Sequence, residues 1–507
     1  MKNNERLYDA ITDIDDDLVE EAGKRRRKKP PKAFWYELIA ACLVIAIGVG
    51  ALVLRKPAED DVLPTGMTGD AHWENNEAVD ATPLETSTSA SAADGAFDAY
   101  ALTLAEYPTM IQYPADPNQN WDSYDTWENA HRERVGLQYR SDSLDAFISE
   151  SVQEFLTGAE GENRVYSPLN VYMALAMLAE LSDGSSRQQL LDVLGCDSIE
   201  SLRTQAGNLW NANYCDDGTV TSLLASSLWL SDRVNFKQET LDLLSNTYYA
   251  SAFQGTMGTA AFDQALQDWV NAQTGGLLTD QVRGLSMDAD TVLSLVTTVY
   301  YRAKWTEEFS ESKTVQSTFH SAKGDVLCDF MNGLSLDNYY WGENFTAVHK
   351  SLENSGAMWF ILPDENVDVE ALLTDVEVLD FILCNGNWEN RSYSMIDLYV
   401  PKFDVSSQLS LIESLKTLGI TEVFNAEASD FTPTAEDTVL SVSEVLHGAR
   451  VTIDEKGIEA AAYTKIDTPG AGFSEESVTF VLDRPFLFVI TNEQGLPLFV
   501  GTVQQPN

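Results

Sequence analysis

The side chains best suited to chemistry in this chain are its five histidines and five cysteines, together with a few neighbouring carboxylates. Such residues act as general bases, nucleophiles or metal ligands when a defined spacing brings them together. Here no C-x-x-C pair occurs, and no cysteine has the spacing to histidine that is typical of a metal site. We therefore expect no bound metal, and we expect buried free thiols rather than disulfides in the folded part. The cysteines are Cys42, Cys196, Cys215, Cys328 and Cys384.

Catalytic motifs are not found in the sequence either. It contains no G-x-S-x-G elbow, H-E-x-x-H pair, phosphate-binding loop or dinucleotide fingerprint. His320, His349 and His447 have no nucleophile close to them in the sequence, so we expect them to make structural hydrogen bonds. The adjacent acids Asp454 and Glu455 are expected to be solvated surface residues. The sequence predicts a protein that is not an enzyme and uses no cofactor.

One segment near the C-terminus has an unusual composition for its position. Val451–Ile453 have the character of a strand, and Pro469 and Gly470 mark an exposed loop. Between them, residues 457–464 read G-I-E-A-A-A-Y-T, which is a run of small residues without a turn signal. These residues need a role other than making a turn.

Charge and composition restrict the class of protein. The 507-residue chain has 44% hydrophobic residues, enough for a substantial core, and a formal net charge of −47. A protein this acidic cannot neutralise phosphate backbones, so nucleic acid is excluded as a partner. An acidic surface mainly indicates solubility.

A membrane anchor is predicted near the N-terminus. Seven basic residues between Lys24 and Lys32 precede the apolar run Leu38–Leu54, and Phe34–Tyr36 supply interfacial aromatic residues. The positive-inside rule places the N-terminus in the cytoplasm and the rest of the chain outside. A cleaved signal peptide is an alternative with a poor cleavage site, and a lipoprotein signal at Cys42 is another, although this cysteine begins the apolar run.

The chain is predicted to have four parts. Residues 1–32 are a cytoplasmic segment, 33–55 the transmembrane helix, 56–140 an extracellular tether with an accessory segment, and 141–507 the folded domain. The tether up to Gly95 is rich in Ala, Thr, Ser and acids. Aromatic residues return between Ala96 and Arg140, where an irregular segment could dock on the domain.

The domain is expected to be α+β, with helices first and strands concentrated in its C-terminal half. An amphipathic helix should begin after Ser141, with Leu144, Phe147, Ile148, Val152 and Phe155 on its apolar face. The expected elements are helices at 171–181 and 409–418 and strands at 292–301, 358–362, 394–399 and 486–491.

The segment H-G-A-R-V-T-I-D-E-K-G-I-E-A-A-A-Y-T at residues 447–464 resembles the proximal hinge of the serpins, the serine protease inhibitor family. Residues 163–195 resemble the family's second helix region, and 296–309 resemble its strand that ends in a hallmark tryptophan, here Trp305. Residues 399–425 and 484–506 extend the resemblance to the end of the chain. It implies a domain with three β-sheets, about nine helices and an exposed reactive loop. Together with the predicted membrane anchor, it leads us to expect a bacterial, membrane-anchored member.

The resemblance also implies a mechanism in which a target protease cleaves the loop and the hinge then enters the large sheet as a new strand. Alternate side chains of a strand face opposite sides, which divides the hinge after Gly457 into two sets. Ile458, Ala460, Ala462 and Thr464 would face the buried side, and Glu459, Ala461, Tyr463 and Lys465 would face outward. Small residues suit such a strand, because bulky ones would overpack the sheet as it enters.

A polar latch in the large sheet follows from the same resemblance, with Ser167, Asn170, Thr297, His447 and Trp305 assigned to it. The family commonly has Ser where Asn170 stands and Asn where Thr297 stands, so different hydrogen bonding is expected here. Ile458 is also larger than the Thr or Ser usual at the first inserted position.

The expected function is extracellular inhibition of serine proteases by a single-pass plasma-membrane protein, a monomer that acts as a suicide substrate. The alternative is a noninhibitory serpin fold used for binding or adhesion. The expected reactive bond joins Ala471 and Gly472, and the second choice is Phe473–Ser474. No Arg or Lys lies between Thr468 and Ser474, which favours elastase-like, chymotrypsin-like or subtilisin-like targets over trypsin-like ones.

Overall fold

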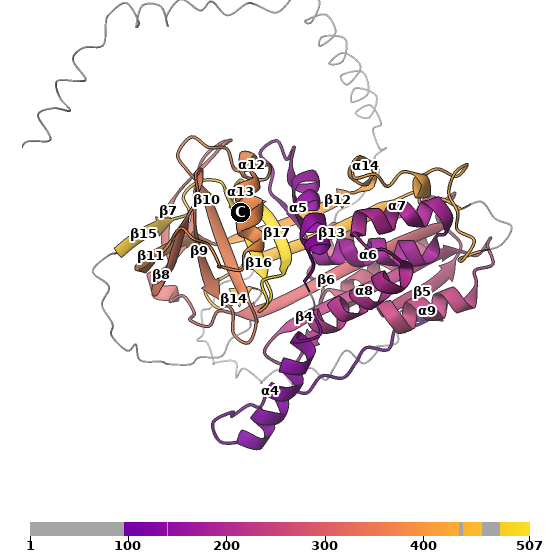
Figure 1. Cartoon of the computed structure of the whole chain (residues 1–507), viewed down its shortest axis with the longest axis horizontal. Helices are drawn as coiled ribbons and strands as arrows, with labels where there is room; N and C mark the ends of the chain where they lie inside the picture. The colour runs from indigo at the N-terminus through magenta and orange to yellow at the C-terminus, as the bar shows by residue number, and fades with distance from the viewer. Residues whose placement is uncertain (1–95, 139, 436–439, 459–476, 507) are drawn as a thin grey trace, which may run out of the picture. The chain divides into compact units, whose positions relative to one another are not determined.

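The computed structural model describes residues 96–138, 140–435, 440–458 and 477–506, and Figure 1 shows how their helices and strands are arranged. The predicted membrane span and the tether before Ala96 lie outside these ranges. Within them, every helix is too short or too polar to cross a bilayer.

The strands of the described residues form two sheets. The first has the order β1-β5-β4-β6-β14-β13-β12, with β3 paired to β4. Its strands are β1 (Ala101–Thr103), β3 (Cys215–Asp216), β4 (Thr221–Ser231), β5 (Ala250–Gly255), β6 (Leu293–Lys304), β12 (Phe403–Ser410), β13 (Val445–Ile453) and β14 (Gly457–Ile458).

The second sheet has the order β15-β11-β8-β9-β10-β16-β17-β2, with β7 paired to β8. Its strands are β2 (Arg164–Tyr166), β7 (Val315–Ser321), β8 (Gly324–Trp341), β9 (Phe345–Ser351), β10 (Ala357–Pro363), β11 (Arg391–Pro401), β15 (Ser477–Val481), β16 (Phe486–Thr491) and β17 (Pro497–Val503). Three separate sheets were expected. Two are found because the 18-residue strand β8 pairs along its length with β7 and β11 and reaches β9 with its last residues, Tyr340 and Trp341.

The α-helices of the described residues include nine of six residues or more, in line with the expected number, and two single turns. The longer ones are α4 (Trp121–Val135), α5 (Asp142–Leu156), α6 (Pro168–Leu181), α7 (Gly184–Leu194), α8 (Ile199–Asn213), α9 (Gln238–Tyr248), α10 (Ala260–Gln273), α13 (Val376–Leu383) and α14 (Ile412–Thr417). The single turns are α11 (Thr279–Val282) and α12 (Val369–Leu372), and the 3₁₀-helices are η1 (Ala96–Tyr100), η2 (Glu311–Lys313) and η3 (Glu422–Phe424).

Helix α5 begins where the sequence predicts. The Ser141 hydroxyl caps it by accepting a hydrogen bond from the Leu144 N–H, and all five residues predicted for its apolar face are buried. The strand predictions also hold, with β16 matching its predicted bounds. The helix expected at 409–418 is shorter, because Leu409 and Ser410 still pair with His447 and Leu446 in the first sheet.

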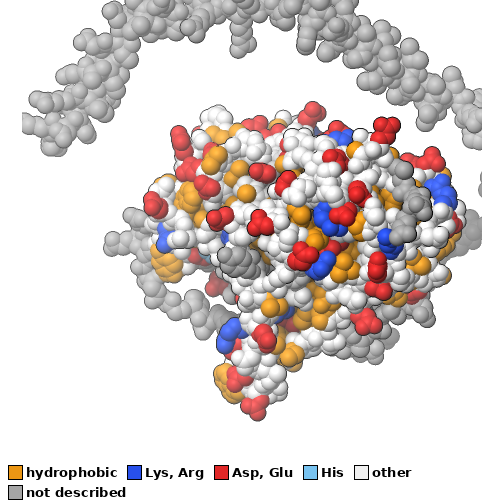
Figure 2. Space-filling view, turned by 45° about the vertical axis from the view of Figure 1, so that its right-hand side comes forward, with side chains coloured by type: hydrophobic (Ala, Val, Ile, Leu, Met, Phe, Trp, Pro, Cys, Tyr) orange, Lys and Arg blue, Asp and Glu red, His pale blue; other side chains and the backbone are white. Residues whose placement is uncertain are grey.

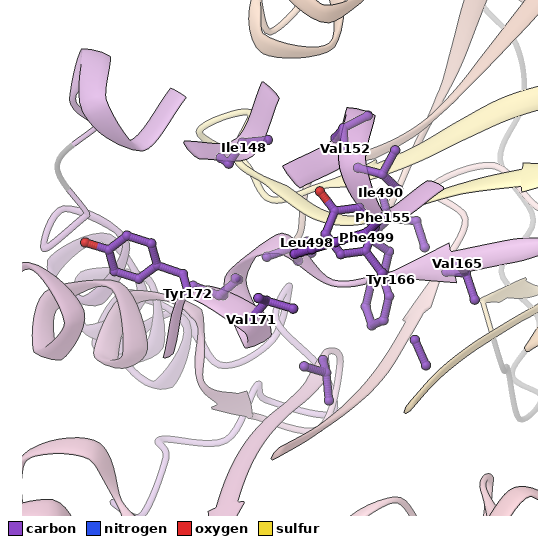
Figure 3. Packing of buried hydrophobic residues seen from close by; sticks show 14 of the residues in the cluster. Ile148, Val152, Phe155, Val165, Tyr166, Val171, Tyr172, Ile490, Leu498 and Phe499 are labelled. Carbon is purple, nitrogen blue, oxygen red and sulfur yellow. The ribbon is translucent and has the colours of Figure 1, made fainter. Parts of the chain in front are cut away.

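Alternation along the strands gives the first sheet a separate hydrophobic cluster on each face. On β4, Leu224, Leu228 and Leu230 belong to the large core shared with α5–α9 and the second sheet, whereas Ala225 and Trp229 belong to a smaller cluster with α10. Figure 3 shows part of the large core, where side chains of α5 and α6 pack against Ile490, Leu498 and Phe499. Both faces of this sheet are therefore covered.

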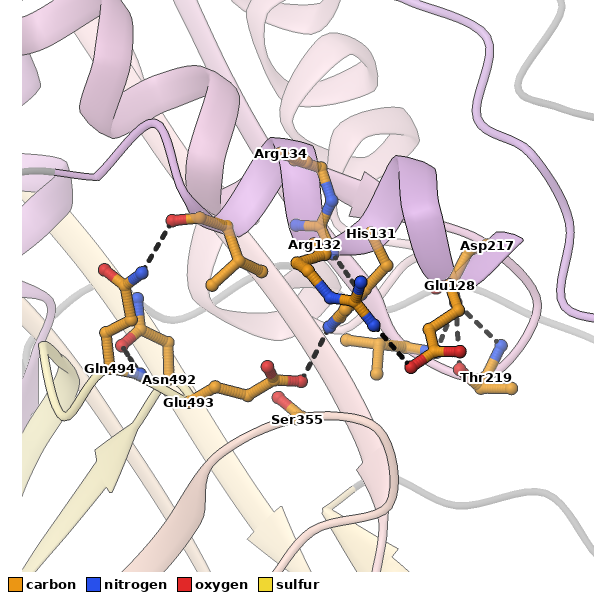
Figure 4. A network of polar contacts seen from close by, with 12 residues as sticks. Glu128, His131, Arg132, Arg134, Asp217, Thr219, Ser355, Asn492, Glu493 and Gln494 are labelled. Atoms are coloured by element: carbon orange, nitrogen blue, oxygen red, sulfur yellow. Dashed lines mark hydrogen bonds and ion pairs between the residues drawn. The ribbon is translucent and has the colours of Figure 1, made fainter. Parts of the chain in front are cut away.

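Residues 96–138 belong to the same compact unit as the domain, so the boundary expected at residue 141 does not separate independent parts. Strand β1 pairs with the edge strand β5, and the Tyr107 ring stacks on Trp210, Tyr214 and Tyr249. Helix α4 is tied to the turn before β17, as Figure 4 shows, through His131 Nε2 at 2.8 Å from the Glu493 carboxylate.

The described cysteines, residues 196, 215, 328 and 384, form no disulfide, as predicted, and all but Cys384 are buried. Burial raises the pKa of the Cys328 thiol to about 11, so it is protonated at neutral pH. Acidic side chains are scattered over the face in Figure 2, in keeping with the strongly negative net charge of the chain.

Candidate functional site

The first sheet opens between two of its central strands. β6 and β13 run parallel and pair directly at only one end, where Leu295, Val296 and Thr297 face Val445, Leu446 and His447. At the other end the short strand β14 lies between them, with Ile458 paired to Ala303 of β6 and to Ile453 of β13. The sheet therefore already contains the first two residues of an additional strand.

Gly457 is the residue that lets β14 enter. A Cβ atom placed on it would lie 2.3 Å from the Ala303 carbonyl oxygen and 2.8 Å from the Lys304 Cα, so no side chain fits there. Ile458 follows with its side chain buried in the large core. Its size is therefore accommodated, although the sequence suggested that it departs from the usual pattern.

The turn that joins β13 to β14 is fixed by polar contacts. Asp454 Oδ1 accepts hydrogen bonds from the backbone N–H groups of Lys456 and Gly457, at 2.8 and 3.1 Å. Glu455 is buried, and its carboxylate accepts from Lys402 Nζ at 2.7 Å and from the Thr314 hydroxyl at 2.6 Å. The expectation that Glu455 is solvated is thus wrong.

The electrostatics of Glu455 follow from these contacts. Burial on its own would raise the pKa of this carboxyl, but the hydrogen bonds from Lys402 and Thr314 outweigh it and the pKa lies below its usual value. Glu455 is therefore charged at neutral pH. Its carboxylate connects the turn to Lys402, which lies between β11 and β12, and to Thr314, which directly precedes β7.

Trp305 lies at this turn and not in the polar latch. Its indole N–H donates to the Asp454 carbonyl at 2.9 Å, and its backbone N–H donates to the Lys456 carbonyl at 3.0 Å. Trp305 directly follows β6, and Thr297 lies eight residues before it on that strand, about 26 Å away at the usual rise. Assigning Trp305 to the same cluster as Thr297 is therefore wrong.

The other four residues assigned to the latch meet where β6 and β13 still pair. Ser167 caps α6 by accepting from the Asn170 N–H, and its own backbone N–H donates to His447 Nε2 at 3.0 Å. Thr297 and His447 are paired across the two strands. This cluster closes the end of the sheet opposite β14.

The protonation state of His447 follows from its contacts. Because Nε2 accepts a hydrogen bond, the proton of the neutral ring sits on Nδ1, which has no partner among the described residues. Burial lowers the pKa of His447 to about 4. The Asn170 side-chain nitrogen also lacks a partner in the described part of the chain, in keeping with the different hydrogen bonding expected there.

Comparison with known proteins fits this geometry. The sequence model of the family described as "Serpin (serine protease inhibitor)" matches residues 142–506. This chain belongs to the serpin family. Its relatives include Serpin-ZX from Arabidopsis thaliana, which is 28% identical over 69% of this chain and 94% of the relative, and Alpha-1-antiproteinase from Rattus norvegicus, 29% identical over 72% and 89%.

Solved serpin structures have the same fold. The thermophilic serpin tengpin in its native state is 26% identical, covers 73% of this chain and 96% of its own, and has a TM-score of 0.64. Arabidopsis AtSerpin1 in its native stressed conformation is also 26% identical, covers 74% and 98%, and has a TM-score of 0.62.

Not all predicted site residues of this serpin can be placed. Hinge residues Gly457 and Ile458 lie in β14, but Glu459, Ala460, Ala461, Ala462 and Thr464 lie outside the described residues, as do Ala471, Gly472, Phe473 and Ser474. The sequence missed Glu455, Lys402 and Thr314 as a group. Their separation along the chain gives no signal that they meet.

Proposed function

We propose that this serpin inhibits serine proteases as a suicide substrate, by inserting the segment after Ile458 between β6 and β13. The observation that carries the proposal is the position of β14, which lies between the two strands before any cleavage. Among the described residues, β6 and β13 pair directly with each other only at residues 295–297 and 445–447, so a strand that continues from β14 would run between them towards this paired end.

The chemistry belongs to the target. The serine hydroxyl of the protease attacks the carbonyl carbon of Ala471, the bond to the Gly472 nitrogen breaks, and the leaving amine takes a proton from the protease's histidine. The protease is then joined to the serpin by an ester. Insertion moves the ester away from the oxyanion hole and the histidine of the protease, both of which hydrolysis by water requires. The outcome therefore depends on whether insertion or hydrolysis is faster.

The target class follows from the residues around the proposed bond. A trypsin-like pocket would hold its carboxylate unpaired against Thr468–Ser474, which contain no Arg or Lys. An elastase-like pocket suits Ala471, and a chymotrypsin-like one would select Phe473. Subtilisin-like enzymes accept either residue.

The site of action proposed here is the outer face of a plasma membrane, with residues 33–55 as the anchor and residues 1–32 in the cytoplasm. The basic cluster before Leu38 supports this orientation. Protease added to intact cells should remove the serpin domain. Protection of the C-terminus from the protease would show that the chain has the opposite orientation. Bacterial origin is an expectation from the anchor, and the relatives named above are plant and mammalian.

A panel of serine proteases tests the inhibitory function. The full chain should form a complex with an elastase-like or chymotrypsin-like enzyme that survives boiling in detergent, because the bond is covalent. If every enzyme that cuts the loop is released in active form, the protein is a noninhibitory member and the proposal is wrong.

A further inference from the structure

A hollow of about 50 Å³, partly open to solvent, lies on the α10 side of the first sheet. Its floor is formed by β6 and β13, with Thr298 and Gly448 among the lining residues. Its walls come from α10 and from the segment through α11, which contributes Leu278, Gln281 and Leu285. The hollow therefore sits over the line along which β6 and β13 would separate.

Two polar atoms in this hollow have no partner among the described residues. They are the hydroxyl oxygen of Thr298, a residue that is only 2% exposed, and Gln281 Oε1. A buried polar group without a hydrogen bond is costly, and it favours an occupant that can supply one. A side chain suited to this hollow would be apolar for the most part and would carry a hydrogen-bonding group.

Gly448 keeps the floor of the hollow open. An added Cβ would meet only Leu278 Cδ1 at 3.7 Å, which is an ordinary contact, so neither crowding nor the backbone requires glycine here. Glycine inside a strand weakens the strand and often marks a place where another group approaches closely. Here that group would come from the hollow side.

The register of β14 predicts which side chain arrives. β14 is antiparallel to both neighbours, with Ile458 beside Ala303 and Ile453. If the strand continues in this register, each further residue moves one position back along β6 and β13. Tyr463 then lies between Thr298 and Gly448, and its side chain points to the face that carries the hollow.

The neighbouring positions on that face fit the same register by size and charge. Ala461 would lie between two large side chains, Tyr300 and Arg450, and Arg450 is already bonded to the Leu277 carbonyl at 2.7 Å. Tyr463 would lie between two small residues, Thr298 and Gly448. Two residues before Ala461, at the preceding position on this face, the carboxylate of Glu459 would lie beside the exposed Arg302. The large inserted residue thus faces small neighbours and the small one faces large neighbours.

We propose that the hollow between β6, β13 and the α10–α11 segment receives the ring of Tyr463 when the loop inserts. This rests on the proposed function, since it requires insertion. The phenol fills the apolar space, and its hydroxyl can donate to Gln281 Oε1. Tyr463 therefore does not point to solvent in the inserted state, as outward-facing residues of the hinge were expected to do, but locks the new strand under α10.

The test compares melting temperatures of the full chain in mild detergent before and after a single cut between Thr468 and Ser474, with the cut verified by mass spectrometry. Cutting should raise the melting temperature of the wild type. Tyr463→Ala should leave the uncut form unchanged and lower the gain by roughly 4 °C, because a ring-sized cavity remains. Tyr463→Phe should keep most of the gain.

A size exchange identifies the contact itself. Gly448→Leu fills the hollow from β13, so it should not lower the melting temperature of the uncut form but should reduce the gain on cutting. In the double variant with Tyr463→Ala, the leucine occupies the space that the ring leaves, and at least half of the lost gain should return. The uncut melting temperatures verify that each variant folds.

The outcomes separate the two proposals. If cutting the wild type gives no gain, insertion does not occur, and the proposed function fails together with this inference. If the wild type gains but Tyr463→Ala gains equally, or if the losses of the two single variants simply add, insertion stands and the ring does not occupy the hollow.

Discussion

The Nζ atom of Lys402 lies 2.7 Å from the carboxylate of Glu455, whose side chain is only 8% exposed. Lys402 follows β11, whereas Glu455 lies in the turn that carries the hinge. The pair therefore connects the second sheet to the point where β14 enters the first.

Breaking this pair should destabilise the native state. Lys402→Met leaves a buried carboxylate with the Thr314 hydroxyl as its remaining side-chain partner, and we expect a loss of about 1–2 kcal/mol in the free energy of unfolding measured with urea. The value is below that of a fully buried pair because Lys402 is 36% exposed. Lys416→Met is the matched control, since Lys416 lies at the same 2.7 Å from the exposed Glu413. Equal effects of the two substitutions would contradict a role for burial.

Gly457→Ala should push the hinge out of the sheet. The added methyl would overlap the Ala303 carbonyl, and overpacking of this kind costs about 2 kcal/mol. Gly207→Ala in α8 is the control, because nothing lies within 4 Å of its added Cβ and helix propensity predicts a gain of up to about 1 kcal/mol. Unfolding in urea measures both, and a neutral Gly457→Ala would mean that β14 does not lie where the structure places it.

Acid should weaken the latch through His447. Its pKa is about 4 in the folded protein and near 6.5 when unfolded, so the unfolded state takes up a proton first as the pH falls. Stability is therefore fully present above about pH 6.5 and decreases towards pH 4, by up to about 3 kcal/mol, and it levels off below that.

The variant His447→Gln checks this assignment, because an amide oxygen can still accept from the Ser167 N–H but does not titrate. Its unfolding free energy should change less between pH 7 and pH 5 than that of the wild type. His320→Gln should leave the wild-type difference almost intact, since His320 is exposed. A wild type with no loss of stability in this interval would show that His447 is not held neutral by burial.

Moving one charge by one residue should convert the inhibitor into a substrate. The double variant Glu459→Ala/Ala460→Glu keeps the composition and net charge but places the carboxylate between Tyr301 and Val451, which are both buried. We expect cleavage to continue while the detergent-stable complex disappears. Persistence of the complex at the wild-type yield would mean that the register of the inserted strand is wrong.

The sequence predicted the elements in which periodicity is strong. The apolar face of α5 and the bounds of β16 follow from local spacing. The inward position of Ile458 was implied by the family resemblance for the inserted strand, and Ile458 is already buried in β14. Family motifs supplied the rest of the architecture, because they link segments that lie far apart in the chain.

Long-range polar partners were beyond such reasoning. Asp454 and Glu455 look alike in the sequence, yet only Glu455 is buried, because Lys402 and Thr314 meet it there. Likewise, the stacking of Tyr107 on Trp210 and Tyr249 depends on the fold that brings these rings together. Residues 96–138 have no hydrophobic periodicity that would predict this contact.

The intact mass of the denatured reaction mixture tests the central claim most directly. After reaction with an elastase-like protease, the account predicts a species whose mass is that of the protease plus this chain up to Ala471, together with a released peptide that begins at Gly472. A peptide that begins at Ser474 would move the bond to Phe473 and leave the mechanism intact. Finding only the unmodified protease and the cleaved chain would contradict covalent trapping by loop insertion.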